Sequence, residues 1–250
     1  MQYHLDTIPV WEAMEWQREC PLCGLARKTE AEEIERVLGA SVMEPGERIK
    51  VNARGICREH HQMMFAKQNR LSHALLMESH HKEQLDTLHK LQSLSASGAG
   101  KPNFFSKRTL AEEISSTLAG MHAHCVVCEK IDTHMSRYHY TFLHLWRTDK
   151  AFRKAWQEGK GVCLPHVQSL MEQSKKVLSR KEQSAFASEA LAHLIQALEI
   201  DAADLAHFTR KFDYRNQSMP WGESKTALER MVNRLRGWCL GDEPYPIKER

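Results

Sequence analysis

Several features that would place a protein in a functional class are scarce or missing in this chain of 250 residues. No apolar run approaches the roughly 20 residues that a helix needs to cross a bilayer, which argues against an integral membrane protein. Lys and Arg number 35 against 32 for Asp and Glu, and a formal net charge of +3 gives no electrostatic reason to expect nucleic acid. The first 15 residues lack a basic head followed by an apolar stretch, so we expect no signal peptide and a cytoplasmic protein.

Catalytic motifs are missing as well. The chain has no GxSxG elbow, no P-loop, no GxGxxG after a strand and no HExxH. No residue can therefore be nominated as catalytic, and an enzyme is not the expected class. Strand patterns are nearly absent, with residues 48–51 as the only short candidate. Helical periodicity at 31–38, 58–94, 110–118, 129–146, 186–212 and 223–236 predicts an all-α fold.

The seven cysteines are what the chain does have, and six of them fall into an internal repeat. Each copy consists of a CxxC motif followed by a GxCxxH motif. The two CxxC motifs lie 105 residues apart and the two GxCxxH motifs 106 residues apart. In a protein of a reducing compartment, cysteines at such spacing indicate metal ligands or redox thiols rather than disulfides. The repeated ligand candidates are Cys20, Cys23, Cys57 and His60 in the first copy, and Cys125, Cys128, Cys163 and His166 in the second.

This spacing suits zinc. Structural zinc takes four tetrahedral ligands, commonly three cysteines and one histidine, with paired ligands a few residues apart. A CxxC turn presents two sulfurs to one ion, and residues at positions i and i+3 share a helix face, so that Cys57 and His60, or Cys163 and His166, can converge. We therefore predict two zinc ions, one within each copy, in an arrangement that resembles a treble-clef finger. An iron–sulfur cluster, another soft metal or buried free thiols are the alternatives.

Other side chains compete for these roles. His61 could replace His60, but the second copy has Val167 at that position. His124 could be an alternative ligand next to Cys125. We interpret Cys239, which has no partner in the repeat, as a small buried residue under the C-terminal helix, with a reactive thiol as the alternative. The histidines of the predicted 58–94 helix, among them His73 and His80, could hold a further metal or form a pH-sensitive surface, although we prefer to interpret them as an ordinary polar helix face.

The repeat sets the domain boundaries. We expect a first module at 1–94, a linker rich in small residues at 95–108, a second module at 109–216, and a C-terminal helix and tail at 217–250. Thr109 with Glu112 predicts a capping box, and Gly237 a helix end.

The motifs resemble a bacterial family of cytoplasmic proteins of unknown function. The resemblance is carried by CPLC at 20–23, SVMEP at 41–45, the two GxCxxH motifs, KFDYRN at 211–216 and WGES at 221–224. It implies a mostly helical protein with two sites of three cysteines and one histidine, and it implies no activity.

A site closed by four protein ligands favours a structural metal. We therefore expect a zinc-binding scaffold or adaptor that binds another protein. A thiol-based redox or metal sensor is an alternative, because CxxC pairs can cycle between dithiol and disulfide. A nucleic-acid-binding zinc protein is a further alternative, against which the near-neutral charge weighs.

Overall fold

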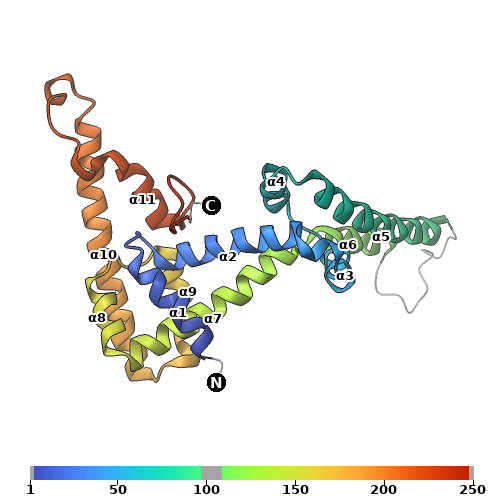
Figure 1. The fold of residues 1–250 in the computed structure, drawn as a ribbon, viewed down its shortest axis with the longest axis horizontal. Coiled ribbons are helices and arrows are strands. Elements are labelled where there is room, and N and C mark those ends of the chain that lie inside the picture. Colours follow the sequence, from blue (N-terminus) through green and yellow to red (C-terminus); the bar gives the residue numbers. More distant parts are fainter. Residues whose placement is uncertain (1–2, 97–108, 248–250) are drawn as a thin grey trace. The chain divides into compact units, whose positions relative to one another are not determined.

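The computed structural model describes residues 3–96 and 109–247, and within them every regular element is a helix (Figure 1). The all-α prediction is therefore confirmed. The predicted linker falls outside the described residues from position 97 onward. The elements are α1 (Tyr3–Glu15), α2 (Pro21–Leu38), η1 (Ala40–Met43), α3 (Pro45–Arg54), α4 (Arg58–Ala66), α5 (Arg70–Ala96), α6 (Leu110–His122), α7 (Val126–Thr148), α8 (Lys150–Glu158), α9 (Leu164–Val177), α10 (Arg180–Arg210), η2 (Tyr214–Asn216), η3 (Gly222–Thr226) and α11 (Ala227–Arg236).

The chain divides into two compact units that do not coincide with the two sequence repeats. The first unit contains residues 1–29 and 133–250, and the second contains residues 30–132. Helices α2 and α7 each contribute residues to both units. Since each of these helices follows a CxxC motif, the unit boundary passes through both copies of the repeat rather than between them.

Two local expectations differ from the structure. Residues 48–51, the one strand candidate, lie inside helix α3, which begins with Pro45 in its first turn, where a proline loses no hydrogen bond. The predicted 58–94 helix is interrupted after α4, because Gln68 has a left-handed backbone with φ of 60°. The side chain of Asn69 then accepts a hydrogen bond from the Ser72 amide, and α5 starts afresh.

Helix ends follow the sequence signals closely. The side chain of Thr109 accepts from the Glu112 amide while Glu112 accepts from the Thr109 amide, which is the predicted capping box of α6. Ser179 and Glu182 form the same device at the start of α10. Gly237 ends α11 with φ of 84°, a conformation that glycine adopts without steric cost.

The first unit has an aromatic core. Phe142 of α7, Phe152 and Trp156 of α8, and Phe186 of α10 are each at most 1% exposed. The ring of Phe142 meets those of Phe152 and Trp156 edge-on, with centroids 5.1 and 5.3 Å apart, a geometry that aromatic pairs prefer. Helices α9, α10 and α11 pack together around this core. Phe142, part of an aromatic stretch at 138–146, thus serves helix packing.

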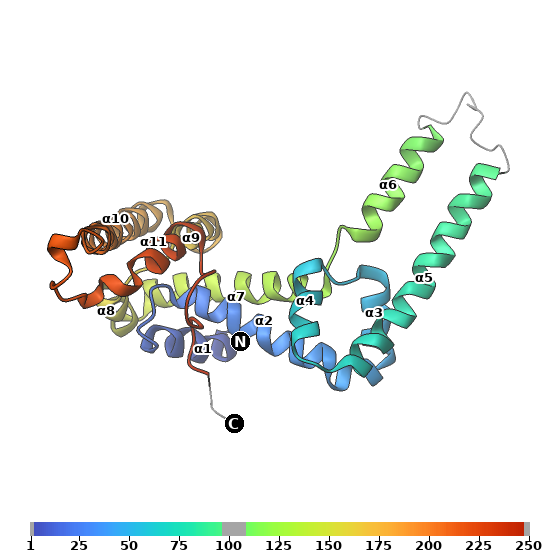
Figure 2. The same cartoon turned by 90° about the horizontal axis from the view of Figure 1, so that it is seen from above.

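The second unit has an aliphatic core that includes part of a cysteine motif. Ile34 of α2, Met64 of α4 and Leu76 of α5 are at most 1% exposed, and Cys125 and Val127 belong to the same cluster. Helices α5 and α6 lie side by side beyond this core (Figure 2). A motif that starts α7 is therefore fixed by residues of three other helices.

None of the helices in the described part of the chain combines the length and the apolar character that a bilayer span requires.

Candidate metal centres

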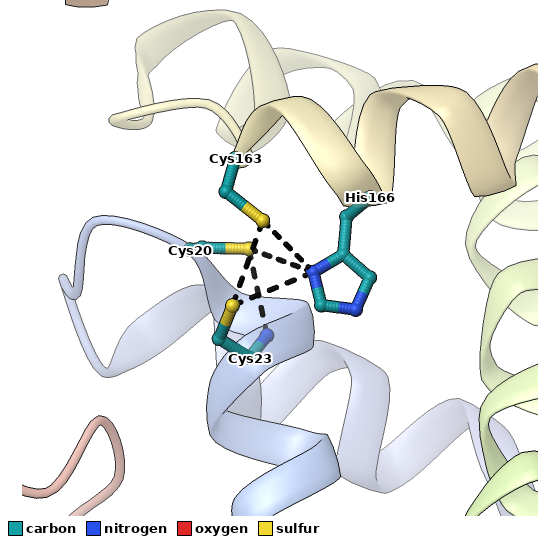
Figure 3. A group of neighbouring side chains, drawn as sticks. All are labelled: Cys20, Cys23, Cys163 and His166. Carbon is teal, nitrogen blue, oxygen red and sulfur yellow. Dashed lines mark hydrogen bonds between the residues drawn. The ribbon is translucent and has the colours of Figure 1, made fainter. Parts of the chain in front are cut away.

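The first group of ligand candidates lies in the first unit, where two helix starts face each other (Figure 3). Cys20 precedes α2 and Cys23 lies in its first turn, whereas Cys163 is the N-cap of α9 and His166 lies in the first turn of that helix. The Nδ1 atom of His166 is 3.4 Å from the sulfurs of Cys20 and Cys23 and 3.1 Å from that of Cys163. The sulfurs of Cys23 and Cys163 are 3.6 Å apart.

The second group repeats this arrangement in the second unit. Cys57 is the N-cap of α4 and His60 lies in its first turn, whereas Cys125 precedes α7 and Cys128 lies in its first turn. The Nδ1 atom of His60 is 3.1 Å from the sulfur of Cys57, 3.3 Å from that of Cys125 and 3.5 Å from that of Cys128. All eight predicted ligand residues are therefore gathered into two groups of four.

The pairing of the motifs, however, differs from the prediction. We expected each copy of the repeat to form its own site, but each group takes its CxxC from one copy and its CxxH from the other. Within each group all four ligand atoms lie within 4.8 Å of one another. Cys20 and Cys23 therefore join Cys163 and His166, whereas Cys125 and Cys128 join Cys57 and His60.

The length of the helices after each CxxC explains the exchange. A helix rises about 1.5 Å per residue, so α2 with 18 residues is about 27 Å long and α7 with 23 residues about 35 Å. Each helix carries the chain away from its CxxC before the CxxH of the same copy is reached. Cys20 and Cys23 thus lie in the first unit, whereas Cys57 and His60 of the same copy lie in the second unit, beside Cys125 and Cys128.

The donor distances fit a single ion in each group. A tetrahedral zinc ion with Zn–S of about 2.3 Å and Zn–N of about 2.0–2.1 Å places neighbouring donor atoms roughly 3.5–3.8 Å apart. Donor pairs in direct contact are 3.1–3.9 Å apart, around this range, and all donors of a group lie within 4.8 Å of one another. All seven cysteines are free thiols. Because four protein atoms complete a tetrahedron, such a site leaves no coordination position for water or substrate.

The family model for DUF6062, a family of unknown function, matches residues 1–242. The chain belongs to this family. No curated protein and no solved structure matches the chain. The expected resemblance to a family without a known activity is confirmed, and the family supplies no role for the two Cys/His groups.

Charge within each group favours a bound cation. In the second group burial raises the pKa of the Cys125 thiol, but its hydrogen bond with His60 outweighs this and the pKa falls to about 6. Burial and the neighbouring Cys125 thiolate raise the pKa of Cys128. Burial lowers the pKa of His60, yet hydrogen bonds with Cys125 and Glu30 raise it to about 10. Three thiolates this close repel one another, so full deprotonation requires a positive ion among them.

The first group also has one cysteine with a lowered pKa and one with a raised pKa. Burial raises the pKa of Cys20, but hydrogen bonds with the other cysteines and the charge of His166 lower it well below its usual range. Hydrogen bonds with Cys163 and Cys20 raise the pKa of Cys23. In each group, therefore, one cysteine has a lowered pKa and the histidine has a pKa raised to about 10, and a metal ion would take the place of the histidine proton as the partner of the thiolate.

Residues outside the motifs orient the ligands, and sequence reasoning missed them. The Nε2 atom of His60 lies 3.0 Å from a carboxylate oxygen of Glu30, which is the partner that metal-binding histidines commonly have. In the first unit, the backbone amide of Trp238 donates to the sulfur of Cys23 at 3.3 Å. Glu30 lies 30 residues from His60 and Trp238 lies 215 residues from Cys23, so no local pattern marked either residue.

The competing histidines and Cys239 are placed elsewhere. The rings of His61 and His73 are nearly parallel, at 12°, and their Nδ1 and Nε2 atoms are 2.8 Å apart. These two nitrogens therefore share an N–H···N hydrogen bond, so His61 and His73 pair with each other. His124 lies 3.7 Å from Glu129 and is not part of the second group. Cys239 is exposed, so the expectation that it is buried is wrong.

The first unit also contains a cavity of about 540 Å³ beside α10 and α11, a volume in the range of small-molecule sites. Its most buried charged residues are Asp201 and Arg234, which are 2% and 4% exposed and form an ion pair at 3.2 Å. Arg230 also binds Asp201, at 3.1 Å, as well as Asp204. The sequence contains a signal that could have revealed this network. Asp201 and Asp204 lie three residues apart on α10, and Arg230 and Arg234 lie four residues apart on α11, so each pair shares a helix face.

Proposed function

We propose that the chain binds one zinc ion in each Cys/His group and that these ions are structural. Three observations support this proposal: the donor set, the tetrahedral spacing of the donor atoms, and the absence of an open coordination position. The spacing carries the most weight, because an iron–sulfur cluster contains at least two irons and its ligands surround all of them. Ligand atoms within 4.8 Å of one another leave room for a single ion.

Each zinc ion would close a long loop of the chain. In the first group it would link Cys23 to Cys163, and in the second His60 to Cys125. A cross-link that closes a loop of this length lowers the conformational entropy of the unfolded chain. On the scale derived for disulfides, each such cross-link raises the free energy of unfolding by about 4–5 kcal/mol. This is comparable with the whole stability of many domains, so metal loss would unfold much of the protein.

The biological role that we propose is that of a scaffold which binds another protein in the cytoplasm, where its thiols would remain reduced. Helix α10 supports this role, since Leu191 and Ile195 lie four residues apart on one face and are 51% and 55% exposed. Large apolar side chains that share an exposed helix face are typical of surfaces that bind proteins.

Elemental analysis of freshly purified protein, followed by circular dichroism during chelation, tests the metal proposal. We expect two zinc ions per chain and a cooperative loss of helicity when both are removed. An unchanged spectrum after removal of both ions would contradict a structural role. For the partner, the variant Leu191→Glu/Ile195→Glu should keep both zinc ions and its helicity but lose proteins that the wild type retains in affinity capture. Equal capture by both forms would contradict this surface.

A further inference from the structure

The two Cys/His groups have the same four donors but different surroundings. In the first group, Cys20 and Cys23 are 6% exposed and Cys163 is 1% exposed. Among the cysteines of the second group only Cys125 is buried, whereas Cys57 and Cys128 are partly exposed. Since donors and spacing are matched, any difference in reactivity between the groups must come from access and from the residues around them.

The C-terminal segment covers the first group. Its Trp238 amide donates to the Cys23 sulfur, and the Arg27 guanidinium lies over the Trp238 ring with its central carbon 5.2 Å from the ring centroid. Arg27 also binds Glu243 at 2.9 Å, which ties a second point of the segment to α2. A β-carbon on Gly24 would lie 2.6 Å from the carbonyl oxygen of Pro244, so the segment passes in direct contact with the CxxC turn.

Little space remains between this cover and the sulfurs. The hollow lined by Cys20, Cys23 and Cys163 on one side and Trp238 and Pro244 on the other has a volume of about 10 Å³. That is the smallest space that can hold one water molecule. A peroxide or an alkylating reagent would therefore reach these sulfurs only when the segment opens.

The second group presents a pair of accessible sulfurs instead. The sulfurs of Cys57 and Cys128 are 3.9 Å apart and both residues are partly exposed. Cys57 starts α4 and Cys128 lies in the first turn of α7, the same helix positions that Cys163 and Cys23 occupy in the first group. Access therefore distinguishes the two pairs of sulfurs, and position along a helix does not.

We propose that Cys57 and Cys128 form a peroxide-sensitive pair, and that their oxidation releases the zinc ion of the second group while the first group retains its ion. This inference rests on the zinc occupancy proposed above. In the reaction, the two zinc–sulfur bonds break and one sulfur–sulfur bond forms, with loss of two electrons. The O–O bond of hydrogen peroxide accepts these electrons and two protons from solvent and gives two water molecules. His60 and Cys125 remain as two protein ligands, too few to hold the ion.

The test uses zinc-loaded, full-length protein with the exposed Cys239 replaced (Cys239→Ser), so that this thiol consumes no reagent. Hydrogen peroxide is added in slight excess. Released zinc is followed with a colorimetric chelator, and remaining thiols are alkylated and located by peptide mass spectrometry. We expect one zinc ion per chain to leave in a fast phase together with a Cys57–Cys128 disulfide. The second ion should leave about tenfold more slowly or not at all.

Two further variants test the cover. A chain that ends at Gly237 lacks the covering segment, and its first group should lose zinc nearly as fast as the second. Arg27→Ala in the full-length chain loosens the same segment by removing the contacts of Arg27 with Trp238 and Glu243, and should accelerate the slow phase even if the shortened chain folds poorly. An unchanged slow phase in Arg27→Ala would show that the segment does not protect the site.

The outcomes separate this inference from the proposed function. Two zinc ions that leave at one rate, or the loss of the first group's ion before that of the second, would overturn the inference and leave the zinc proposal intact. A disulfide between Cys20 and Cys23 in the fast phase would overturn it as well. A purified chain without bound metal would overturn the proposed function itself.

Discussion

Arg234 is the residue through which α11 stabilises the first Cys/His group. Its Nη1 atom donates to the backbone carbonyl oxygens of Glu19, at 2.7 Å, and Lys160, at 2.9 Å. Glu19 directly precedes Cys20, and Lys160 lies three residues before Cys163, so both ligand-bearing loops are held by one guanidinium. Its Nε atom pairs with Asp201, and both side chains are almost completely buried. The substitution Arg234→Met keeps a long apolar stem and removes all of these bonds.

The expected cost follows from burial. Removal of one partner of a buried ion pair costs about 3–5 kcal/mol, because the other charge loses its compensation. Asp201 keeps Arg230, which lowers this cost, but the carbonyl oxygens of Glu19 and Lys160 lose their donor, which adds a smaller cost because these residues are partly buried and exposed, respectively, and water can replace the donor. We therefore expect a total of about 3–5 kcal/mol. In a chain of this size that corresponds to a fall in melting temperature of about 6–20 °C.

Thermal unfolding of the zinc-loaded protein measures this cost. Arg236→Met is the matched control, since Arg236 lies on the same helix but is exposed. The control should change the melting temperature by about 2 °C or less. A double-mutant cycle with Asp201→Asn should show coupling between Arg234 and Asp201. If Arg234→Met destabilises no more than Arg236→Met does, the reasoning from burial and loop contacts is refuted.

Three further predictions concern individual contacts. Glu30→Ala removes the carboxylate beside the His60 ligand and should weaken zinc binding at the second group about 10–100-fold, measured by competition with a chelator. Zinc binding at the first group in the same molecule should stay unchanged. Equal weakening of both groups would contradict a local effect. Gly24→Ala places a β-carbon against the covering segment and should lower the free energy of unfolding in denaturant by about 1–3 kcal/mol. Gly120→Ala, in open space on α6, should raise it by about 0.5–1 kcal/mol. A change of the same sign in both variants would refute the packing argument. Burial lowers the pKa of His73 in the folded chain, so the unfolded chain binds protons more readily and stability is lost as pH falls below about 6.5. His73→Gln should lessen this loss and exposed His81→Gln should not; identical pH profiles would show that His73 does not contribute.

The identity of the ligand residues could be predicted from sequence, because the two ligands of each pair lie only three residues apart along the chain. The CxxC and CxxH spacings each place two donors on one turn, and the repetition of both motifs singled out six of the seven cysteines. Helix caps such as Thr109 with Glu112 were predictable for the same reason, since cap and partner lie three residues apart.

The pairing of the motifs could not be predicted in this way. A donor pair carries no information about which other pair completes its tetrahedron, and the repeat favoured the nearer one. What decides the pairing is the length of the helices that follow Cys23 and Cys128, which the sequence pattern placed only approximately. Glu30, Arg234 and Trp238 escaped notice because their roles depend on contacts between distant parts of the chain.

The exchange of motifs between the two copies is the central claim, and zinc counts in two double variants test it most directly. Cys20→Ala/Cys163→Ala removes two ligands from one group, so that we expect one zinc ion per chain by elemental analysis. Cys20→Ala/Cys57→Ala removes one ligand from each group, and we expect no tightly bound zinc. If each copy of the repeat instead formed its own site, the first variant would have no zinc and the second would retain one ion.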